Sequence, residues 1–184
     1  MKKSISIDEI ENKASLFLIE FNIHEPFVPI EQIVKGNNIN LMPYDFDDEI
    51  SGVLVIKDNI ATIGYNKANS KERIRFTIAH EFAHHTLHWK PQAKSNQEVF
   101  VDKDLFMKFR NTLNEYNQEE VRIEQQANAF AAAILMPKHF IEKELNKVEY
   151  QKLKETNIIQ KLASKFKVSE PAMTYRLANL QMFY

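Results

Sequence analysis

Four histidines and a glutamate lie within twelve residues of the sequence, in the stretch TIAHEFAHHTLH at positions 77–88. His80 and His84 are four residues apart, so on a helix their rings project from one face, one turn apart. This separation suits two nitrogen ligands of a single tetrahedral zinc ion. Glu81 precedes His84 by three residues, which places its carboxylate beside the same site as a general base for an attacking water. The spacing therefore predicts a catalytic metal site.

The other histidines are not expected to bind this metal. His88 follows His80 by eight residues, which is about 12 Å along a helix axis. We expect His88 in the last turn of the helix, where the helix dipole favours its charged form, or simply packed against a neighbour. His85 lies off the ligand face and is expected at the surface or in packing, while the isolated His24 and His139 receive no role.

A catalytic zinc ion usually has three protein ligands and one open position, so a third ligand must come from further along the chain. The stretch VRIEQQANAFAAAILMP places Glu124 and Asn128 four residues apart on a predicted helix whose other face is apolar. A carboxylate beside such a face is costly unless a positive group meets it, and a metal would do so. Asn128 could accept a hydrogen bond from the distal ring nitrogen of a metal-bound histidine. On spacing alone, Glu124 could equally face solvent, and Glu119 and Glu120 compete with it as ligands.

The elements that must position these residues follow from hydrophobic periodicity and capping signals. A helix opens at the capping box of Ser6 and Glu9, and short helices fill the chain from Pro137 to Tyr184. Between them the pattern predicts, in order, a short helix at 29–36, a strand at 39–44, a hairpin at 52–66 that turns at 57–59, a helix at 70–88, an extended piece at 98–101, a helix around 105–113 and a helix from 118.

This order of helices, small sheet and helices predicts an α+β fold with a mainly antiparallel sheet and an active-site helix. We expect residues 60–66 to form an edge strand that holds an extended substrate by β-augmentation, with Tyr65 near the mouth of the cleft or simply packed within the strand. Tyr65, His85 and His88 are the candidates for stabilising the oxyanion of the reaction.

Two stretches of the chain together resemble the ImmA/IrrE family of metallopeptidases. RIRFTIAHEFAHHTLH and EQQANAFAAAILMP are similar to the family pattern R-F-T-x-A-H-E-x-x-H followed by E-x-x-A-N-x-F-A-x-x-L-M-P. The strands before the first block and the end of the chain also look like the family, whereas residues 89–117 have no clear counterpart. The one visible departure is Ala83, where the family commonly has glycine, and a methyl group there is harmless to a helix.

The resemblance implies a zincin-like metallopeptidase core in which His80, His84 and Glu124 hold zinc and Glu81 is the catalytic base. It also implies a regulatory protease of narrow specificity, since family members cleave a partner transcriptional repressor in phages, mobile elements and stress responses. We expect the core to span residues 1–137, with a C-terminal helical lobe at 138–184 packed on it.

The C-terminal lobe raises the alternative of DNA binding, because IIQKLASKFKVSEPAMTYRLANL has the outline of a helix-turn-helix with Ser169 capping the second helix. Residues 158–184 carry four positive side chains and one negative: Lys161, Lys165, Lys167, Arg176 and Glu170. The polar side chains of the second helix are chiefly Thr174, Tyr175, Arg176 and Asn179. This surplus is modest for a DNA reader, so we expect a helical bundle that packs on the core or recognises a helix-turn-helix repressor.

The charge and composition of the chain exclude several kinds of binding partner and of catalytic or metal site. The formal net charge of −1 gives no chain-wide field for attracting nucleic acid or an anionic membrane. The chain has no cysteine, which excludes disulfides, thiolate ligands and a cysteine nucleophile. The start MKKSISIDEIENK lacks the apolar segment of a signal peptide, and we expect a cytoplasmic protein without a membrane partner. The alternative for the whole chain is a non-catalytic regulatory or binding module with a structural metal site, which would have no need for Glu81 as a base.

Overall fold

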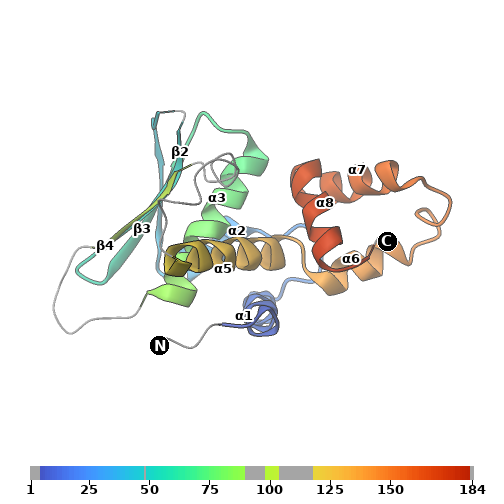
Figure 1. The fold of residues 1–184 in the computed structure, drawn as a ribbon, viewed down its shortest axis with the longest axis horizontal. Coiled ribbons are helices and arrows are strands. Elements are labelled where there is room, and N and C mark those ends of the chain that lie inside the picture. The colour runs from blue at the N-terminus through green and yellow to red at the C-terminus, as the bar shows by residue number, and fades with distance from the viewer. Residues whose placement is uncertain (1–4, 48, 90–97, 104–117, 183–184) are drawn as a thin grey trace. The chain divides into compact units, whose positions relative to one another are not determined.

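The computed structural model describes residues 5–47, 49–89, 98–103 and 118–182, which form an α+β protein (Figure 1). Its elements are α1 (Ile7–Glu20), α2 (Ile30–Gly36), β1 (Asn40–Tyr44), β2 (Ile50–Lys57), β3 (Ile60–Asn66), α3 (Lys71–Ala83), the π-helix η1 (His84–His88), β4 (Glu98–Lys103), α5 (Gln118–Leu135), α6 (Lys138–Leu145), α7 (Glu155–Phe166) and α8 (Glu170–Asn179). The helix predicted around 105–113 lies outside the described residues.

The chain divides into two compact units. One unit is Ile30–Ala131 and contains the sheet, α2, α3, η1 and most of α5. The other joins Met1–Pro29 to Ala132–Tyr184 and contains α1 and α6 to α8. The division into 1–137 and 138–184 remains a prediction.

The sheet has four described strands in the order β1-β3-β2-β4. β2 pairs antiparallel with both β3 and β4, so the prediction of a mainly antiparallel sheet is confirmed, while β1 adds to β3 in parallel. The β2–β3 hairpin turns at Asp58 and Asn59, which have φ values of 51° and 63° as a tight two-residue hairpin turn requires.

The predicted role of residues 60–66 as an edge strand is wrong. β3 lies between β1 and β2, so its backbone groups are occupied on both sides by ladder hydrogen bonds. Among the described strands, the free edges belong to β1 and β4. A substrate therefore cannot add to β3 as a further strand.

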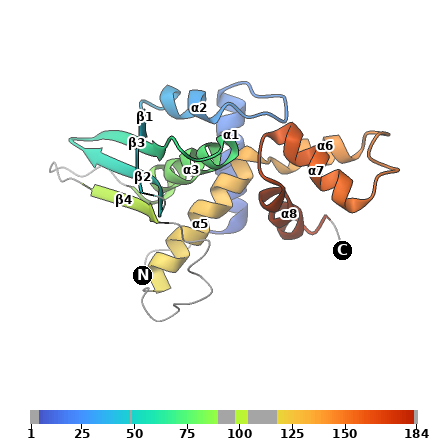
Figure 2. The same ribbon diagram turned by 90° about the horizontal axis from the view of Figure 1, so that it is seen from above.

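One face of the sheet packs on α3, and this packing forms the core of the unit (Figure 2). Leu54 and Ile56 on β2 and Ile63 on β3 are fully or almost fully buried at alternate positions, as expected for strands with one covered face. Helix α3 begins after Ser70, whose side chain accepts a hydrogen bond from the backbone N–H of Arg73. The predicted cap at Ser70 is thus confirmed, as is the capping box of the first helix.

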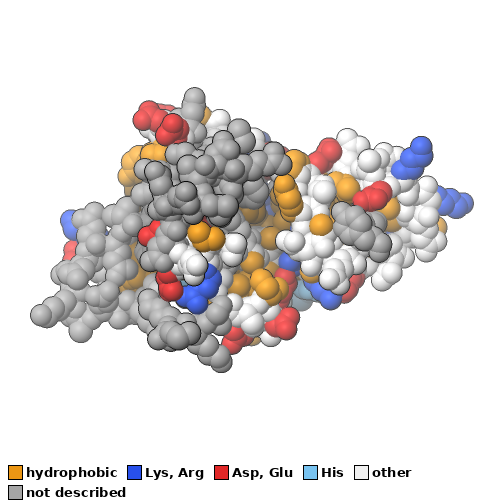
Figure 3. All heavy atoms as spheres, in the orientation of Figure 1, with side chains coloured by type: hydrophobic (Ala, Val, Ile, Leu, Met, Phe, Trp, Pro, Cys, Tyr) orange, Lys and Arg blue, Asp and Glu red, His pale blue; other side chains and the backbone are white. Residues whose placement is uncertain are grey.

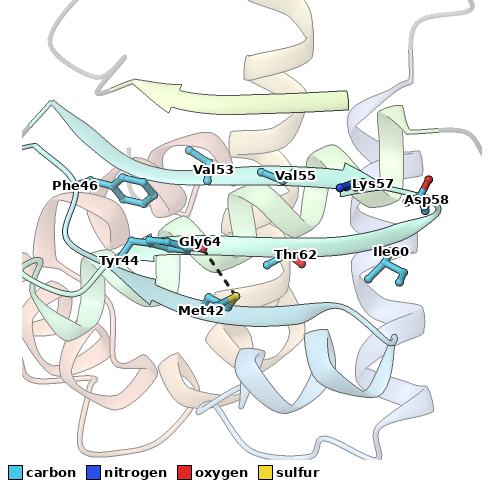
Figure 4. Close-up of a pocket in the computed structure, with 10 residues that line it drawn as sticks. All are labelled: Met42, Tyr44, Phe46, Val53, Val55, Lys57, Asp58, Ile60, Thr62 and Gly64. Carbon is cyan, nitrogen blue, oxygen red and sulfur yellow. Dashed lines mark hydrogen bonds between the residues drawn. The ribbon is translucent and has the colours of Figure 1, made fainter. Parts of the chain in front are cut away.

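The opposite face of the sheet carries a shallow, mostly apolar groove of about 510 Å³ (Figure 4). Met42, Tyr44 and Ile60 line it with 45%, 44% and 59% of their surface exposed. The side chains drawn in Figure 4 lie on the side of the sheet turned away from α3, so the groove is separate from the histidine-bearing helix.

In the other unit, Arg176 is buried, with 5% of its surface exposed, and it joins three segments. Its guanidinium donates to both carboxylate oxygens of Glu11 on α1 and, at 2.9 Å, to the carbonyl oxygen of Met136. Arg176 was counted among the polar side chains that the second helix could offer to DNA, but its contacts with Glu11 and Met136 enclose it and remove it from that set. The predicted cap is confirmed, since Ser169 accepts from the N–H of Ala172.

The surface of the same unit carries charges of both signs. On the face shown in Figure 3, described basic side chains lie among acidic ones and do not gather into one continuous patch. None of the described helices is both long and apolar enough to cross a membrane.

Candidate metal centre

The two motif histidines lie side by side at the end of α3. His80 and His84 are each only 3% exposed, and their Nε2 atoms are 3.0 Å apart. Their rings meet edge to face with centroids 4.7 Å apart. Residues four apart on a helix share a face, so the helix alone brings the two nitrogens to one point.

Helix α5 brings Glu124 to the same point. Its Oε2 is 3.1 Å from Nε2 of His80, and its Oε1 is 3.3 Å from Nε2 of His84. His80, His84 and Glu124 form a group whose potential ligand atoms all lie within 4.8 Å of one another. The competing Glu119 and Glu120 are exposed, and neither belongs to this group.

The donor set fits a zinc ion. Ligand atoms about 2.0–2.1 Å from a tetrahedral zinc ion are about 3.3 Å from one another, close to the 3.0, 3.1 and 3.3 Å found here. Burial alone would raise the pKa of Glu124, but hydrogen bonds and charge from His80 and His84 lower that pKa to about 2. The carboxylate is therefore charged at neutral pH, as a metal ligand must be.

Asn128 orients one of the two rings. Its Oδ1 lies 3.1 Å from Nδ1 of His80, one helical turn beyond Glu124 on α5. When Nδ1–H donates to this oxygen, the lone pair of Nε2 is free to face Glu124 and His84. The contact between Asn128 and His80, which was expected from the four-residue spacing of Glu124 and Asn128, is therefore present.

Glu81 lies on α3, between the two histidines in the sequence, and it is fully buried. Its side chain lies close to strand β2. A Cβ atom placed on Gly52 of β2 would be 3.5 Å from its Oε1. Gly52 was not among the residues predicted for the site. A glycine inside a strand pattern was the signal, because it often marks a close approach of two backbones.

The helix does not continue regularly to His88 as predicted. It changes to a π-helix at His84–His88, in which the N–H of Trp89 donates to the carbonyl of His84 at 3.1 Å. The ring of His88 lies 5.8 Å from that of His84, and it makes a hydrogen bond with the backbone of Ile123, the residue before Glu124.

His88 is packed rather than charged. Burial, followed by the charge of His84, lowers the pKa of His88 to about 4, although a hydrogen bond to the backbone of Ile123 opposes this. His88 lies in the last turn of η1, as predicted, and its ring also packs towards α5, where it bonds the backbone of Ile123. His85 stacks on Trp89 with ring centroids 4.9 Å apart. The roles suggested for Tyr65, His85 and His88 at an oxyanion remain predictions.

Comparisons with known proteins identify the family to which the chain belongs. The family model of the M78 peptidases, described as the IrrE N-terminal-like domain, matches residues 35–178. Among solved structures, a Mycobacterium tuberculosis transcriptional regulator is similar in fold, with a TM-score of 0.63 at 16% sequence identity. The similarity covers 93% of this chain and 46% of the regulator, so the chain spans about half the regulator's length. No curated protein sequence matches the chain. Because the family model covers most of the sequence, the chain belongs to peptidase family M78, the IrrE N-terminal-like domains.

Proposed function

We propose that the protein is a zinc-dependent endopeptidase, in which His80, His84 and Glu124 hold the metal and Glu81 is the catalytic base. The observation that carries the proposal is a cluster of three ligand atoms, two nitrogens and a carboxylate oxygen, with Glu81 on the same helix. Three protein ligands and one open position are typical of catalytic zinc, whereas structural zinc sites have four protein ligands.

The chain's own residues supply the proton transfers. A zinc ion held there would act as a Lewis acid that polarises the scissile carbonyl and makes water more acidic. Glu81 would accept a proton from the attacking water and deliver it to the nitrogen of the leaving amine. Because Glu81 is fully buried, little bulk water competes for its carboxylate. Asn128 would keep His80 in the tautomer whose Nε2 can bind metal.

We further propose that the substrate is one specific protein partner, a helix-turn-helix transcriptional repressor in the cytoplasm. The resemblance to the ImmA/IrrE family supports this choice, and the M. tuberculosis protein of similar fold is a transcriptional regulator. The helical lobe of α6 to α8 would recognise the repressor, and residues 1–137 would form the zincin-like core that cuts it.

The test is to incubate the zinc-loaded protein with the repressor encoded beside it and to measure fragment masses by mass spectrometry. We expect one main cut, its loss after chelation and its return when zinc is added. Glu81→Gln is the control that should not cut. Repressor binding without cleavage by the zinc-loaded wild type would contradict the proposal and favour a non-catalytic binding module. Cleavage that persists after complete zinc removal would exclude the mechanism.

A further inference from the structure

Strand β2 approaches α3 so closely at Gly52 that no side chain fits there. A Cβ atom on Gly52 would lie 2.3 Å from Cγ2 of Thr77 and 3.5 Å from Oε1 of Glu81. Carbon atoms normally come no closer than about 3.5 Å in good packing. Thr77 and Glu81 are one turn apart on α3, so both face β2 at this point.

An irregularity in the strand accompanies this contact. Ile50 pairs with Lys103 of β4 and Gly52 pairs with Asp102, so Ser51 is the extra residue of a β-bulge. The side chain of Ser51 is buried and accepts two hydrogen bonds from Arg73, at 3.1 Å from Nε and 2.8 Å from Nη2. Arg73 belongs to the first turn of α3, so the bulge holds the start of this helix while Gly52 packs against its middle.

We propose that the Ser51–Gly52 bulge is a positioning element for Glu81: it fixes how close α3 lies to β2 and so where the Glu81 carboxylate stands. Gly52 is then a positioning residue, not a catalytic one. The expected effect on catalysis rests on the proposed peptidase function. The expected effect on the spacing of β2 and α3 does not, because it concerns the metal-free protein as well.

The effect of a methyl group at this position follows from the distances. With alanine at residue 52, the distance from its Cβ to Cγ2 of Thr77 must increase by roughly 1 Å to reach ordinary van der Waals contact. Thr77 is fully buried, so a change of its χ1 rotamer would press its methyl or hydroxyl group against other atoms of the packed core. We therefore expect helix α3 to move away from β2 and to take Glu81 with it. A shift of about 1 Å at reacting groups can lower a rate roughly 100-fold.

The test compares three variants at saturating zinc and a temperature at which all of them are folded. Gly52→Ala should lower kcat by about 10- to 100-fold with KM changed less than about threefold. Adding Thr77→Ser, which removes the contacting methyl group, should restore kcat to within about fivefold of wild type. Gly64→Ala is the matched control, because its Cβ would meet Tyr44 and Val53 at 3.0 and 3.1 Å on the other face of the sheet. It should leave kcat unchanged even if the protein becomes less stable.

Crystal structures of metal-free Gly52→Ala and of the double variant give a readout that does not depend on activity. We expect the distance between β2 and α3 to increase in the single variant and to return in the double variant. Unchanged spacing in Gly52→Ala would overturn the inference, whether or not the wild type proves to be a peptidase. Increased spacing with wild-type kcat, or an equal loss of kcat in Gly64→Ala, would also overturn it. A wild type that cuts no protein while Gly52→Ala shows the shift would instead count against the peptidase proposal and leave the positioning geometry confirmed.

Discussion

Removal of Glu124 should affect zinc binding far more than removal of Asn128, although the two residues are one turn apart on α5. Glu124 contacts both imidazole nitrogens directly, at 3.1 and 3.3 Å, and its carboxylate is charged. Asn128 contacts Nδ1 of His80, the nitrogen turned away from the cluster. Loss of such indirect support costs about 10- to 100-fold in metal affinity. For Glu124→Ala we therefore expect more than 100-fold, which corresponds to more than about 2.7 kcal/mol of binding free energy.

The assay is competition with a chromophoric chelator, which gives the zinc dissociation constant of each purified variant. Glu119→Ala is the matched control, since Glu119 lies on the same helix but is exposed and pairs with Arg122 on that helix. It should bind zinc like the wild type. An affinity loss for Glu124→Ala no greater than that for Asn128→Ala, or a large loss for Glu119→Ala, would refute the assignment of the third ligand.

Three further predictions concern the unit that contains α1 and α6 to α8. Arg176→Ala should lower the free energy of unfolding by about 2–3 kcal/mol, because it removes charge-assisted hydrogen bonds, and a double-mutant cycle with Glu11→Gln should show that the losses are not additive. Residues 158–184 should give no tight, salt-dependent binding to duplex DNA; a gel shift at nanomolar protein in physiological salt would contradict this. Glu144, a buried residue of α6, accepts hydrogen bonds from the side chains of Lys147 and Lys165. Burial would raise the pKa of Glu144, but these two lysines lower it below its usual value of 4.5. The stability that this carboxylate contributes should therefore be present above about pH 4.5 and lost as the pH falls through the lowered pKa. Urea unfolding of wild type and Glu144→Gln at pH 3 and pH 6 should show a difference that shrinks at the lower pH; a constant difference would refute the charge effect.

The sequence predicted those parts of the site that local geometry determines. His80 and His84 are four residues apart, as are Glu124 and Asn128, so each pair lies on one helix face. The first pair contacts the second, as expected: Asn128 contacts His80, and Glu124 lies beside both histidines. Helix caps and the hairpin turn at Asp58 and Asn59 were also predictable, because each depends on a few neighbouring residues. Spacing alone left Glu124 in competition with Glu119 and Glu120, since the rotation of α5 towards α3 is a tertiary contact.

Other features depend on packing between distant segments and could not be predicted in this way. The pattern of β3 does not show that β1 pairs along its other side in parallel, so the strand was assigned to an edge. Arg176 has the polar character of a surface residue, and only its contacts with Glu11 and Met136 show why it is buried. The π-helix that ends at His88 adds one residue to a turn, and helical periodicity carries no signal for it.

The central claim is that the metal cluster and Glu81 together hydrolyse a peptide bond, and Glu81→Gln tests it most directly. The amide keeps the size of the side chain but cannot accept the proton of the attacking water, while His80, His84 and Glu124 remain in place. Zinc content and repressor fragments should be measured on the same preparation, by elemental analysis and mass spectrometry. We predict one zinc ion per chain in both proteins, with fragments from the wild type and none from the variant. Cleavage by Glu81→Gln at the wild-type rate would contradict the account.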